Sequence, residues 1–244
     1  MTRVFADLHL CVNTRDSAAS SQTIRRASEL GYKHVSVPFW PETPETEISK
    51  LRACCVDAGV DYVSRVDLRP KSQNDLMRQL RKLRRRYEVV CVACENKEVA
   101  RQAAKDHRVD LLSFPSLDFR RRFFDRAEAE LASNSLAALE IDIKPLLVLE
   151  GPSRIRLLSN LRREVAVAIE FHVPIVVSSG VGDEWLLRKP REMASLAGLT
   201  GLGSSEALDA VSKNPCSIVY RNRGKLSSGF VAPGIRIIRE GSDC

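Results

Sequence analysis

Carboxylates and a histidine recur two residues apart within apolar segments that have the length of strands. Asp7 and His9 lie in the first such segment, and Glu140 and Asp142 lie in a later one. Residues two apart on a strand point to the same side of a sheet, so Glu140 and Asp142 would act together. Such carboxylates could carry out acid–base chemistry, or they could hold arginine side chains in position. The residues alone leave both possibilities open.

Metal-dependent hydrolysis would need more ligands than the sequence offers. Hydrolytic metal centres gather several histidines and carboxylates. The chain has only four histidines, His9, His34, His107 and His172, and the last two fall at expected helix C-termini. An imidazole is favourable there for the helix itself. We therefore expect no metal site in the protein.

Two further motifs that could carry chemistry have ordinary structural explanations. Ser178-Ser179-Gly180 lacks the GxSxG surroundings of a nucleophilic serine and is typical of a turn after a buried strand. Cys91 and Cys94 have CxxC spacing, but positions three apart on a strand point to opposite faces. We therefore expect no catalytic residue in either motif.

A basic stretch from Arg65 to Arg86 is the most unusual feature of the composition. It holds nine Lys or Arg residues against Asp67 and Asp75, and this excess of seven equals the net charge of the whole chain. The basicity behind the isoelectric point of about 9.2 is therefore local. A local excess of this kind indicates a polyanionic partner.

The second half of this stretch predicts an amphipathic helix over residues 72–86. Leu76, Leu80 and Leu83 recur at helical spacing and predict the buried face, while five cations occupy the remaining arc. Ser72 with Asp75 resembles a capping box with a shortened acid. Few acids stand four residues from these cations, so a binding face and an ordinary solvated face both stay open.

Strands and helices are predicted to alternate along most of the chain. Expected strands begin near Val4, His34, Val60, Tyr87, Val109, Leu136, Pro174 and Ser217, with helices between them. Parallel strands joined by helices, about eight in number, predict an α/β fold with a single TIM-like (β/α) barrel. A doubly wound open sheet is the alternative, but the GxGxxG turn is missing after the first strand. We expect one barrel domain over residues 1–221 and a Gly/Ser/Arg-containing C-terminal tail over 222–244.

Chemically active residues of such a barrel lie just beyond the C-terminal ends of its strands. The expected rim is polar and rich in arginine. Its members are Asp7 and His9, Arg65 and Asp67, Glu95 and Lys97, Asp142 and Lys144, Ser178 and Ser179, and Arg221 and Arg223.

No apolar run has the length needed to cross a bilayer, and the N-terminal segment does not have the pattern of a signal peptide. The seven cysteines lie mostly in apolar segments, as is usual in a reducing compartment. We therefore expect a cytoplasmic protein.

Six segments, taken in order, resemble the archaeal family of ribonuclease P protein component 3, whose eukaryotic counterpart is a subunit of nuclear RNase P and RNase MRP. The resemblance covers the chain from Phe5 to about Arg223. The segments are Phe5–Leu8, Ser64–Leu68, Val109–Pro115, Ala138–Ile141, Pro174–Gly180 and Arg188–Glu192.

The resemblance implies a barrel distantly related to the polymerase and histidinol phosphatase metallohydrolases, without their metal site. Asp7-Leu8-His9 is similar to the start of their DxHxH motif, and Cys11 stands in place of the second histidine. It also implies a ribonucleoprotein whose RNA, with Mg²⁺, removes the 5′ leader of precursor tRNA. The protein would bind the RNase P RNA together with component 2 and other protein subunits, and it would meet precursor tRNA indirectly.

On this interpretation, arginines would neutralise phosphates of the catalytic RNA without reading its sequence. We expect Arg65 and Arg69 to be the main RNA contacts, followed by the helix residues and by two residues near the last expected strand. The remaining expected contacts are Arg81, Arg85, Arg86, Arg221 and Arg223. Phe39 and Trp40 would either stack on an RNA base or pack against protein.

Two other functions stay open. A metal-dependent phosphoesterase of the related barrel superfamily would lose its activity when metal is removed, whereas an RNA-binding subunit would still bind RNA. A protein-interaction barrel would use the basic helix to meet an acidic protein, and unrelated RNA would not compete with that partner.

Overall fold

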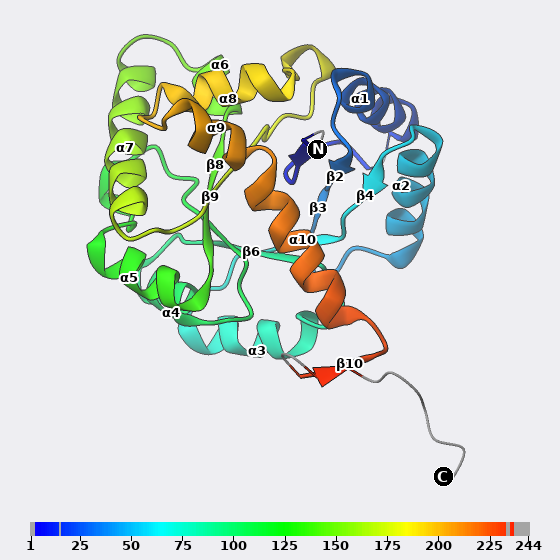
Figure 1. The fold of residues 1–244 in the computed structure, drawn as a ribbon, viewed down its shortest axis with the longest axis horizontal. Coiled ribbons are helices and arrows are strands. Elements are labelled where there is room, and N and C mark those ends of the chain that lie inside the picture. Colours follow the sequence, from blue (N-terminus) through cyan, green and yellow to red (C-terminus); the bar gives the residue numbers. More distant parts are fainter. Residues whose placement is uncertain (1–2, 15, 233–234, 237–244) are drawn as a thin grey trace.

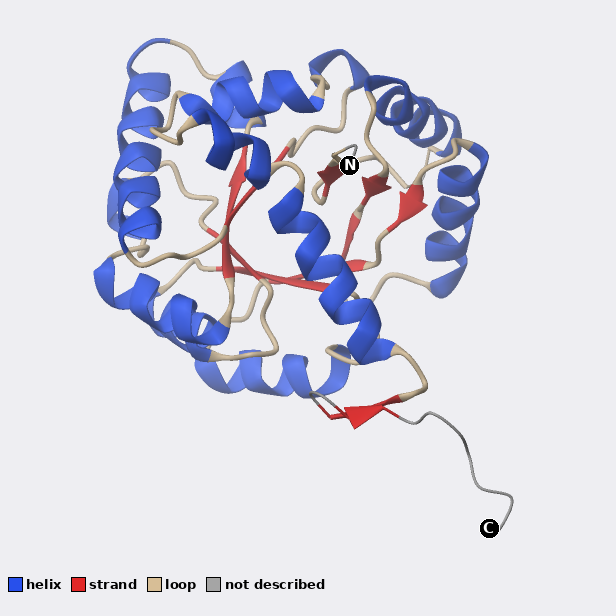
Figure 2. Cartoon of the chain, in the orientation of Figure 1, coloured by secondary structure: helices blue, strands red, loops and turns tan. Residues whose placement is uncertain are grey.

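Parallel strands form the centre of the molecule and helices surround them (Figure 1). The computed structural model of the chain describes residues 3–14, 16–232 and 235–236. In Figure 2 the red strands, except the short one near the C-terminal end, lie inside a ring of blue helices, which is the arrangement of a (β/α) barrel. The predicted fold class is therefore confirmed.

The strands form two parallel sheets. The larger sheet has the order β3-β5-β6-β7-β8-β9, and the smaller has the order β1-β2-β4. The larger sheet consists of β3 (Pro38–Phe39), β5 (Arg65–Leu68), β6 (Val89–Ala93), β7 (Leu111–Ser113), β8 (Ala138–Asp142) and β9 (Ile175–Ser178). The smaller sheet consists of β1 (Ala6–Asp7), β2 (His34–Val35) and β4 (Asp61–Tyr62).

The two sheets continue into each other, because the chain passes from β2 to β3 and from β4 to β5 across only two residues each time. The strand expected near Val60 is thus divided in two, and the strand expected near His34 ends at Val35 and is followed by a second short strand, Pro38–Phe39. The ring closes between the segments that follow β1 and β9. There the N–H of Gly180 donates to the carbonyl of His9 at 2.9 Å, and the N–H of Cys11 donates to that of Val181 at 2.8 Å.

The helices have ends set by side chains that the sequence provides. Their bounds are α1 (Ser17–Leu30), α2 (Glu45–Asp57), α3 (Gln73–Leu83), α4 (Lys97–Lys105), α5 (Arg126–Ser135), α6 (Lys144–Val148), α7 (Gly151–Glu170), α8 (Pro190–Gly198), α9 (Ser204–Ala210) and α10 (Lys213–Leu226). Ser72 accepts a hydrogen bond from the first turn of α3, as expected, and Asn96 does the same for α4. Gly31 ends α1 in the left-handed conformation, with φ of 102°.

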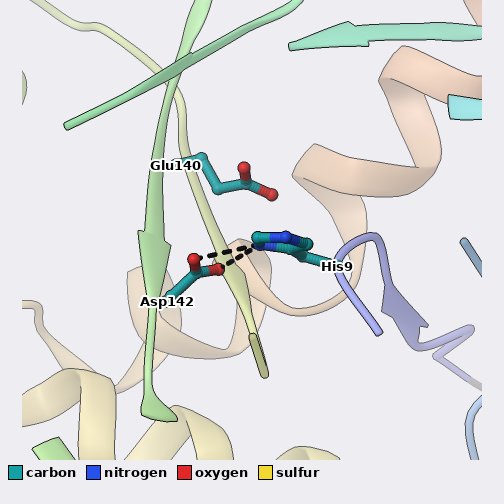
Figure 3. A group of neighbouring side chains, drawn as sticks. All are labelled: His9, Glu140 and Asp142. Atoms are coloured by element: carbon teal, nitrogen blue, oxygen red, sulfur yellow. Dashed lines mark hydrogen bonds and ion pairs between the residues drawn. The ribbon is translucent and has the colours of Figure 1, made fainter. Parts of the chain in front are cut away.

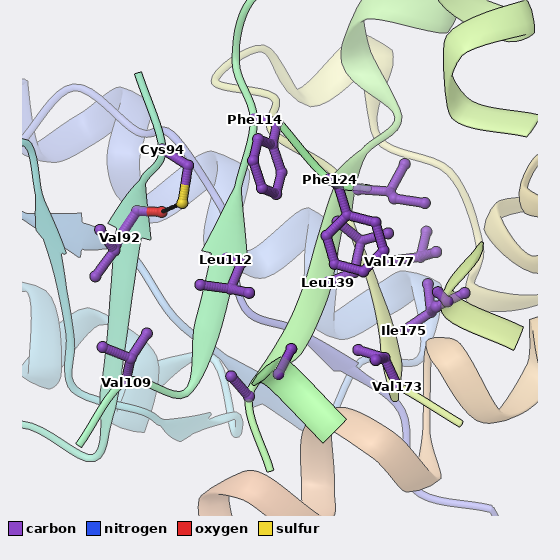
Figure 4. Close-up of a cluster of buried hydrophobic side chains, with 14 of the residues drawn as sticks. Val92, Cys94, Val109, Leu112, Phe114, Phe124, Leu139, Val173, Ile175 and Val177 are labelled. Atoms are coloured by element: carbon purple, nitrogen blue, oxygen red, sulfur yellow. Dashed lines mark hydrogen bonds between the residues drawn. The ribbon is translucent and has the colours of Figure 1, made fainter. Parts of the chain in front are cut away.

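Alternate residues of the strands pack on two sides of the barrel wall. Val92, Leu112, Leu139 and Val177 face the helices, as the close-up in Figure 4 shows. A second set of buried residues fills the interior of the barrel, including Leu8, Val89, Cys91, Leu111 and Val176. Cys91 and Cys94 belong to different sets, so the prediction that they face opposite sides is confirmed.

The last expected strand, Ser217 to Tyr220, is wrong because these residues lie inside α10. A short apolar run of this kind does not distinguish a strand from a buried helical turn. Cys216, Ile218 and Val219 join the interior cluster with Ala6 and Leu8. In Figure 1 this orange helix crosses in front of the strands, so it covers one end of the barrel.

The end of the chain differs from the expected division at residue 221. α10 continues through Leu226, and β10 (Phe230–Ala232) then pairs antiparallel with β11 (Ile235–Arg236). Residues 233–234 and 237–244 of the expected tail lie outside the described residues.

Two helix predictions are also corrected. The residue pattern over residues 117–131 predicts one helix, but the structure has a short 3-10 turn, η1 (Phe119–Arg121), followed by α5. The apolar spacing in α7 predicts Ile155 on the inner face, but Ile155 is 69% exposed, whereas Leu157, Leu161 and Glu164 are buried. Glu164 faces inward because Arg122 forms an ion pair with it at 2.6 Å, an interaction between segments that helical periodicity does not reveal.

A search of the described helices for one that is both long enough and apolar enough to span a membrane finds none.

Candidate functional site

The C-terminal ends of the strands bring together the predicted rim residues of β1, β5, β8 and β9. The Nδ1 atom of His9 lies 2.8 Å from Oδ1 of Asp142, and Nε2 of His9 lies 3.9 Å from Oδ2 of Asp67. Figure 3 shows His9 and Asp142 pointing toward each other beside Glu140. Glu140 and Asp142 do act on the same side of β8, as their spacing predicts.

Arg65 occupies the centre of this acidic cluster. Its guanidinium donates to both carboxylate oxygens of Glu140, to both oxygens of Asp67 and to the carbonyl oxygen of Leu8, at 2.6 to 3.2 Å. A guanidinium has five N–H donors, so all of them are used. Arg65 is also 0% exposed.

The expectation that Arg65 contacts RNA is therefore wrong. No surface of the side chain is open to a phosphate, and no donor is left to bind one. The sequence could not show this, because Glu140 stands 75 residues away from Arg65 along the chain. The second interpretation of the paired carboxylates, that they hold an arginine in position, is the one the structure supports.

Burial and charge shift the pKa values of the cluster in different directions. Burial by itself would raise the pKa of Glu140, but the charge of Arg65 outweighs it and holds that pKa at about 2. Burial likewise disfavours charge on His9, yet the neighbouring Asp142 carboxylate raises the pKa of His9 well above its usual value. Burial raises the pKa of Asp7, against hydrogen bonds from Ser179. Glu140 and His9 are thus held in their charged forms, whereas burial favours the protonated form of Asp7.

Gly180 is needed at the turn that follows β9, because its φ is +64° and a Cβ there would lie 2.9 Å from Cβ of Asp142. This turn lets the segment after β9 approach Asp142 closely. The glycine of the Ser-Ser-Gly motif therefore has a structural role at the C-terminal end of the barrel.

A divalent metal ion fits this cluster poorly. Among the described residues, ligand atoms of His9, Glu140 and Asp142 all lie within 4.8 Å of one another, which is the spacing of a metal site. Both oxygens of Glu140 already accept hydrogen bonds from Arg65, and one also accepts from Ser178. The guanidinium supplies the positive charge that an ion would bring, and it would repel such an ion.

The two serines are not arranged as nucleophiles. Ser178 is buried and donates its hydroxyl to Glu140 at 2.8 Å, while Ser179 donates to the carbonyl of His9 at 3.2 Å. Neither contact supplies a histidine base, so these hydroxyls support the structure of the barrel mouth.

Above the cluster a pocket of about 370 Å³ opens to solvent. His9, Asp67 and Asp142 line it together with Phe39, Trp40 and Arg69. Phe39 is buried, whereas Trp40 is half exposed, and the guanidinium of Arg69 lies 4.9 Å from the centroid of the Trp40 ring. Arg69 is also 4.0 Å from Glu95. Of the two arginines expected to bind RNA first, only Arg69 reaches the surface.

The other cations lie at the opposite end of the barrel. α3 buries Leu76, Leu80 and Leu83 as predicted and turns its basic arc outward. At and just beyond its C-terminus the exposed Arg81, Lys82, Arg85 and Arg86 form no ion pair with a carboxylate of the described residues. We call these four residues the basic patch. Like charges of this kind gathered on one surface attract a polyanion.

Asp110 links α10 to the segment that carries the basic patch through hydrogen bonds. It is buried at the start of β7 and accepts hydrogen bonds from Arg84 at 2.7 Å, Arg221 at 3.0 Å and Asn222 at 2.8 Å. Burial and the nearby charges of Arg221 and Arg84 lower the pKa of Lys225, which places this lysine in the same positive surroundings. Arg84, Arg221 and Lys225 therefore extend the positive region of the basic patch onto α10.

Arg221 and Arg223 are thus not at the rim with Asp7 and His9, as expected, but at the N-terminal ends of the strands. The reason is that α10 replaces the strand that would have carried them upward. Arg223 binds the carboxylates of Asp61 and Glu88, so it fastens α10 to the barrel. Sequence reasoning missed Asp110, Arg84 and Lys225, because their roles come from contacts between distant segments.

Comparison with known proteins gives consistent results. The profile of the family described as RNase P subunit p30 matches residues 4–227. The chain is similar to Ribonuclease P protein component 3 of Methanosarcina barkeri, with 33% identity over 88% of this chain and 87% of the relative. It is also similar to the protein of that name from Methanothermobacter thermautotrophicus, with 26% identity over 97% of this chain and 96% of the relative.

Solved structures agree on the fold. A chain in the cryo-EM structure of archaeal ribonuclease P with mature tRNA has a TM-score of 0.85, at 21% identity over 98% of this chain and 100% of that chain. A lactonase from Listeria monocytogenes has a TM-score of 0.56, at 9% identity over 88% of this chain and 94% of that one. The barrel fold is therefore shared with a lactonase as well as with a chain of the archaeal ribonuclease P structure.

Proposed function

This chain belongs to the RNase P subunit p30 family and is a protein subunit of ribonuclease P, and on that premise we propose that it binds the catalytic RNA through the basic patch. In this role it supports removal of the 5′ leader of precursor tRNA by the RNA, together with component 2 and other protein subunits. The Mg²⁺ that this reaction needs would be held by the RNA. The complex would work in the cytoplasm.

The observation that carries the proposal is the set of exposed cations without acidic partners at one end of the barrel. Arg81, Lys82, Arg85 and Arg86 lie on one helix end, next to Arg84, Arg221 and Lys225 around Asp110. When these cations bind RNA phosphates, they would displace counterions that are condensed on the RNA. The release of these counterions favours association. Close approach of RNA helices that otherwise repel each other would then be stabilised.

The chain itself would supply no catalytic group. Arg65 fills the acidic cluster at the barrel mouth, and the hydroxyls of Ser178 and Ser179 are engaged with Glu140 and with the backbone of His9. These contacts argue against the metal-dependent phosphoesterase that the shared barrel would otherwise suggest. Phosphoester hydrolysis by the isolated chain that stops on addition of a chelator would contradict this part of the proposal.

The test is precursor-tRNA cleavage by reconstituted RNase P RNA and component 2 at moderate magnesium, with the wild-type chain or with a variant. In the test variant Arg81, Lys82, Arg85 and Arg86 are all changed to Glu. We expect this variant to lose most of the stimulation of cleavage while its thermal unfolding stays close to that of the wild type, because the four side chains are exposed.

The control reverses the same number of charges on α7. Its exposed residues Arg154, Arg156, Arg162 and Arg163 are changed to Glu, which alters the net charge of the chain by the same amount. We expect this control to keep much more of the stimulation. Equal loss in both variants would mean that overall charge, and not the basic patch, determines RNA binding.

A further inference from the structure

The pocket at the barrel mouth combines a planar surface near solvent with hydrogen-bonding groups deeper inside. Trp40 is 50% exposed and the side chain of Arg69 is 57% exposed, so both keep exposed surface at the entrance, with the guanidinium of Arg69 over one face of the Trp40 ring. The side chains of His9, Asp67 and Asp142 are 15%, 19% and 25% exposed, which places them deeper. The pocket volume of about 370 Å³ lies in the range of small-molecule binding sites.

We propose that this pocket binds a single unpaired nucleobase of RNA. The inference rests on the proposed function, because it takes RNA as the partner, but it uses a site at the opposite end of the barrel from the basic patch. RNA bases that are not paired stack on aromatic rings and on the planes of arginine side chains. Trp40 and Arg69 provide both surfaces at the pocket entrance.

The charges that line the pocket favour entry of the base over entry of the RNA sugar–phosphate backbone. Asp67 and Asp142 would repel a phosphate from the deeper part, while Arg69 at the entrance would attract one. The ribose and phosphate therefore stay outside and the base points inward. A lysine or arginine of a protein could also meet the carboxylates, but the exposed guanidinium of Arg69 at the entrance disfavours an incoming cation.

The deeper groups also predict which bases fit. The oxygens of Asp142 interact with one ring nitrogen of His9, at 2.8 and 3.0 Å, so they retain capacity to accept another hydrogen bond. Exocyclic amino groups of adenine, cytosine and guanine can donate to such oxygens. Uracil has no amino group and presents carbonyl oxygens on both sides of its N–H, which the carboxylates repel. The pocket should therefore prefer bases with an amino group over uracil.

Tryptophan fluorescence can test this directly. The chain has two tryptophans, and Trp185 is 81% exposed, so Trp185→Phe leaves Trp40 as the reporter within a full-length, folded chain. Short single-stranded RNAs would be added that differ only at one central position, carrying adenosine, uridine or an abasic residue in a uridine background. We expect saturable quenching of Trp40 that is strongest with adenosine and weakest with the abasic RNA.

Two variants of the pocket distinguish RNA binding at this site from RNA binding at the basic patch. Loss of one base–aromatic stack weakens binding by about 5- to 150-fold, so Trp40→Leu should reduce affinity for the adenosine RNA by a factor in that range and bring it to that of the abasic RNA. Asp142→Asn should reduce the preference of adenosine over uridine. Melting curves of both variants would show whether the barrel is still folded.

Four results would overturn the inference. If adenosine and abasic RNAs bind equally, or if Trp40→Leu leaves RNA affinity unchanged while the basic-patch variant loses it, the pocket does not hold a base and the proposed function stands. If a lysine-rich peptide quenches Trp40 and RNA does not, the pocket serves a protein. If RNA binds to neither end of the wild-type chain, the proposed function fails together with this inference.

Discussion

Arg65 shows how one residue can keep its predicted importance and change its role. It lies in the segment with the largest charge excess, which led to the expectation of an RNA contact. In the structure it is buried and joins β5 to β8 through Glu140 and to β1 through the carbonyl of Leu8. Composition could predict a cationic region, but not which cation turns inward, because that depends on a carboxylate from a distant strand.

Replacing Arg65 by Met should strongly destabilise the barrel. Removing one partner of a buried ion pair leaves an uncompensated charge, which usually lowers the free energy of unfolding by about 3–5 kcal/mol. Unfolding in urea, followed by circular dichroism, would measure the difference from the wild type. The double variant Arg65→Met, Glu140→Met should recover part of the loss, since it leaves no charge of this pair buried.

The pH dependence gives a second check on the same ion pair. The folded-state pKa of Glu140, about 2, is below its unfolded value of about 4.3. The stabilisation by this carboxylate is therefore fully present above about pH 4.3 and is lost as the pH falls toward 2. The gap in unfolding free energy between the wild type and Arg65→Met should narrow over that range. A gap that stays constant from pH 6 to pH 3 would show that Glu140 and Arg65 are not coupled.

At the scale of elements, the sequence predicted most helices and the first seven strand positions, because their apolar periodicity and end signals are local. Ser72 caps α3 as predicted, and Asn96 and Gly31 are local end signals of the same kind for α4 and α1. The sequence predicted a strand where α10 lies, because only a short run of its apolar residues faces the barrel interior. This segment forms a helix and not a strand because the ring already closes between β1 and β9. That closure depends on the assembled barrel and is not visible in a local sequence pattern.

Asn222 provides a test of how α10 is held. It is fully buried, and its side-chain amide donates to the carbonyl of Glu88 at 2.7 Å and to Asp110 at 2.8 Å. Asn222→Ala would leave both acceptors without this donor, so the free energy of unfolding should fall by about 1–3 kcal/mol. Ser217→Ala, on the exposed side of the same helix, should change it by less than about 0.5 kcal/mol. Similar small effects for both variants would mean that the hydrogen bonds of Asn222 contribute little to holding α10.

For the whole molecule, the most important result is the separation of two surfaces that the sequence had placed together. Arg69 stands at the C-terminal end of the barrel beside Trp40, while Arg81, Arg85 and Arg86 lie at the other end near α10. The single basic stretch in the sequence therefore serves both ends, since the chain crosses the barrel from β5 to the end of α3. Arg221 joins the second surface through Asp110.

Because the two surfaces are separate, a variant at one end of the barrel should change the salt dependence of RNA binding differently from a variant at the other end. Removing a cation that contacts a phosphate lowers the slope of log affinity against log salt concentration by about one. Lys82→Ala should show that change and should weaken binding to all RNAs by a similar factor. Trp40→Leu should weaken binding with little change in slope, because stacking releases few counterions. Filter binding from 50 to 300 mM KCl would compare them, and a parallel loss of slope in both variants would contradict two distinct modes of contact.

The position of α10 also bears on how the protein is made. Synthesis proceeds from the N-terminus, so α10 is the last of the barrel helices to leave the ribosome. Until Leu226 has emerged, Asp61, Glu88 and Asp110 lack the partners that α10 provides, and the interior around Ala6 and Leu8 stays open at one end. A nascent chain that stops short of this helix would therefore expose an apolar opening to chaperones, whereas the finished chain closes it with its own sequence.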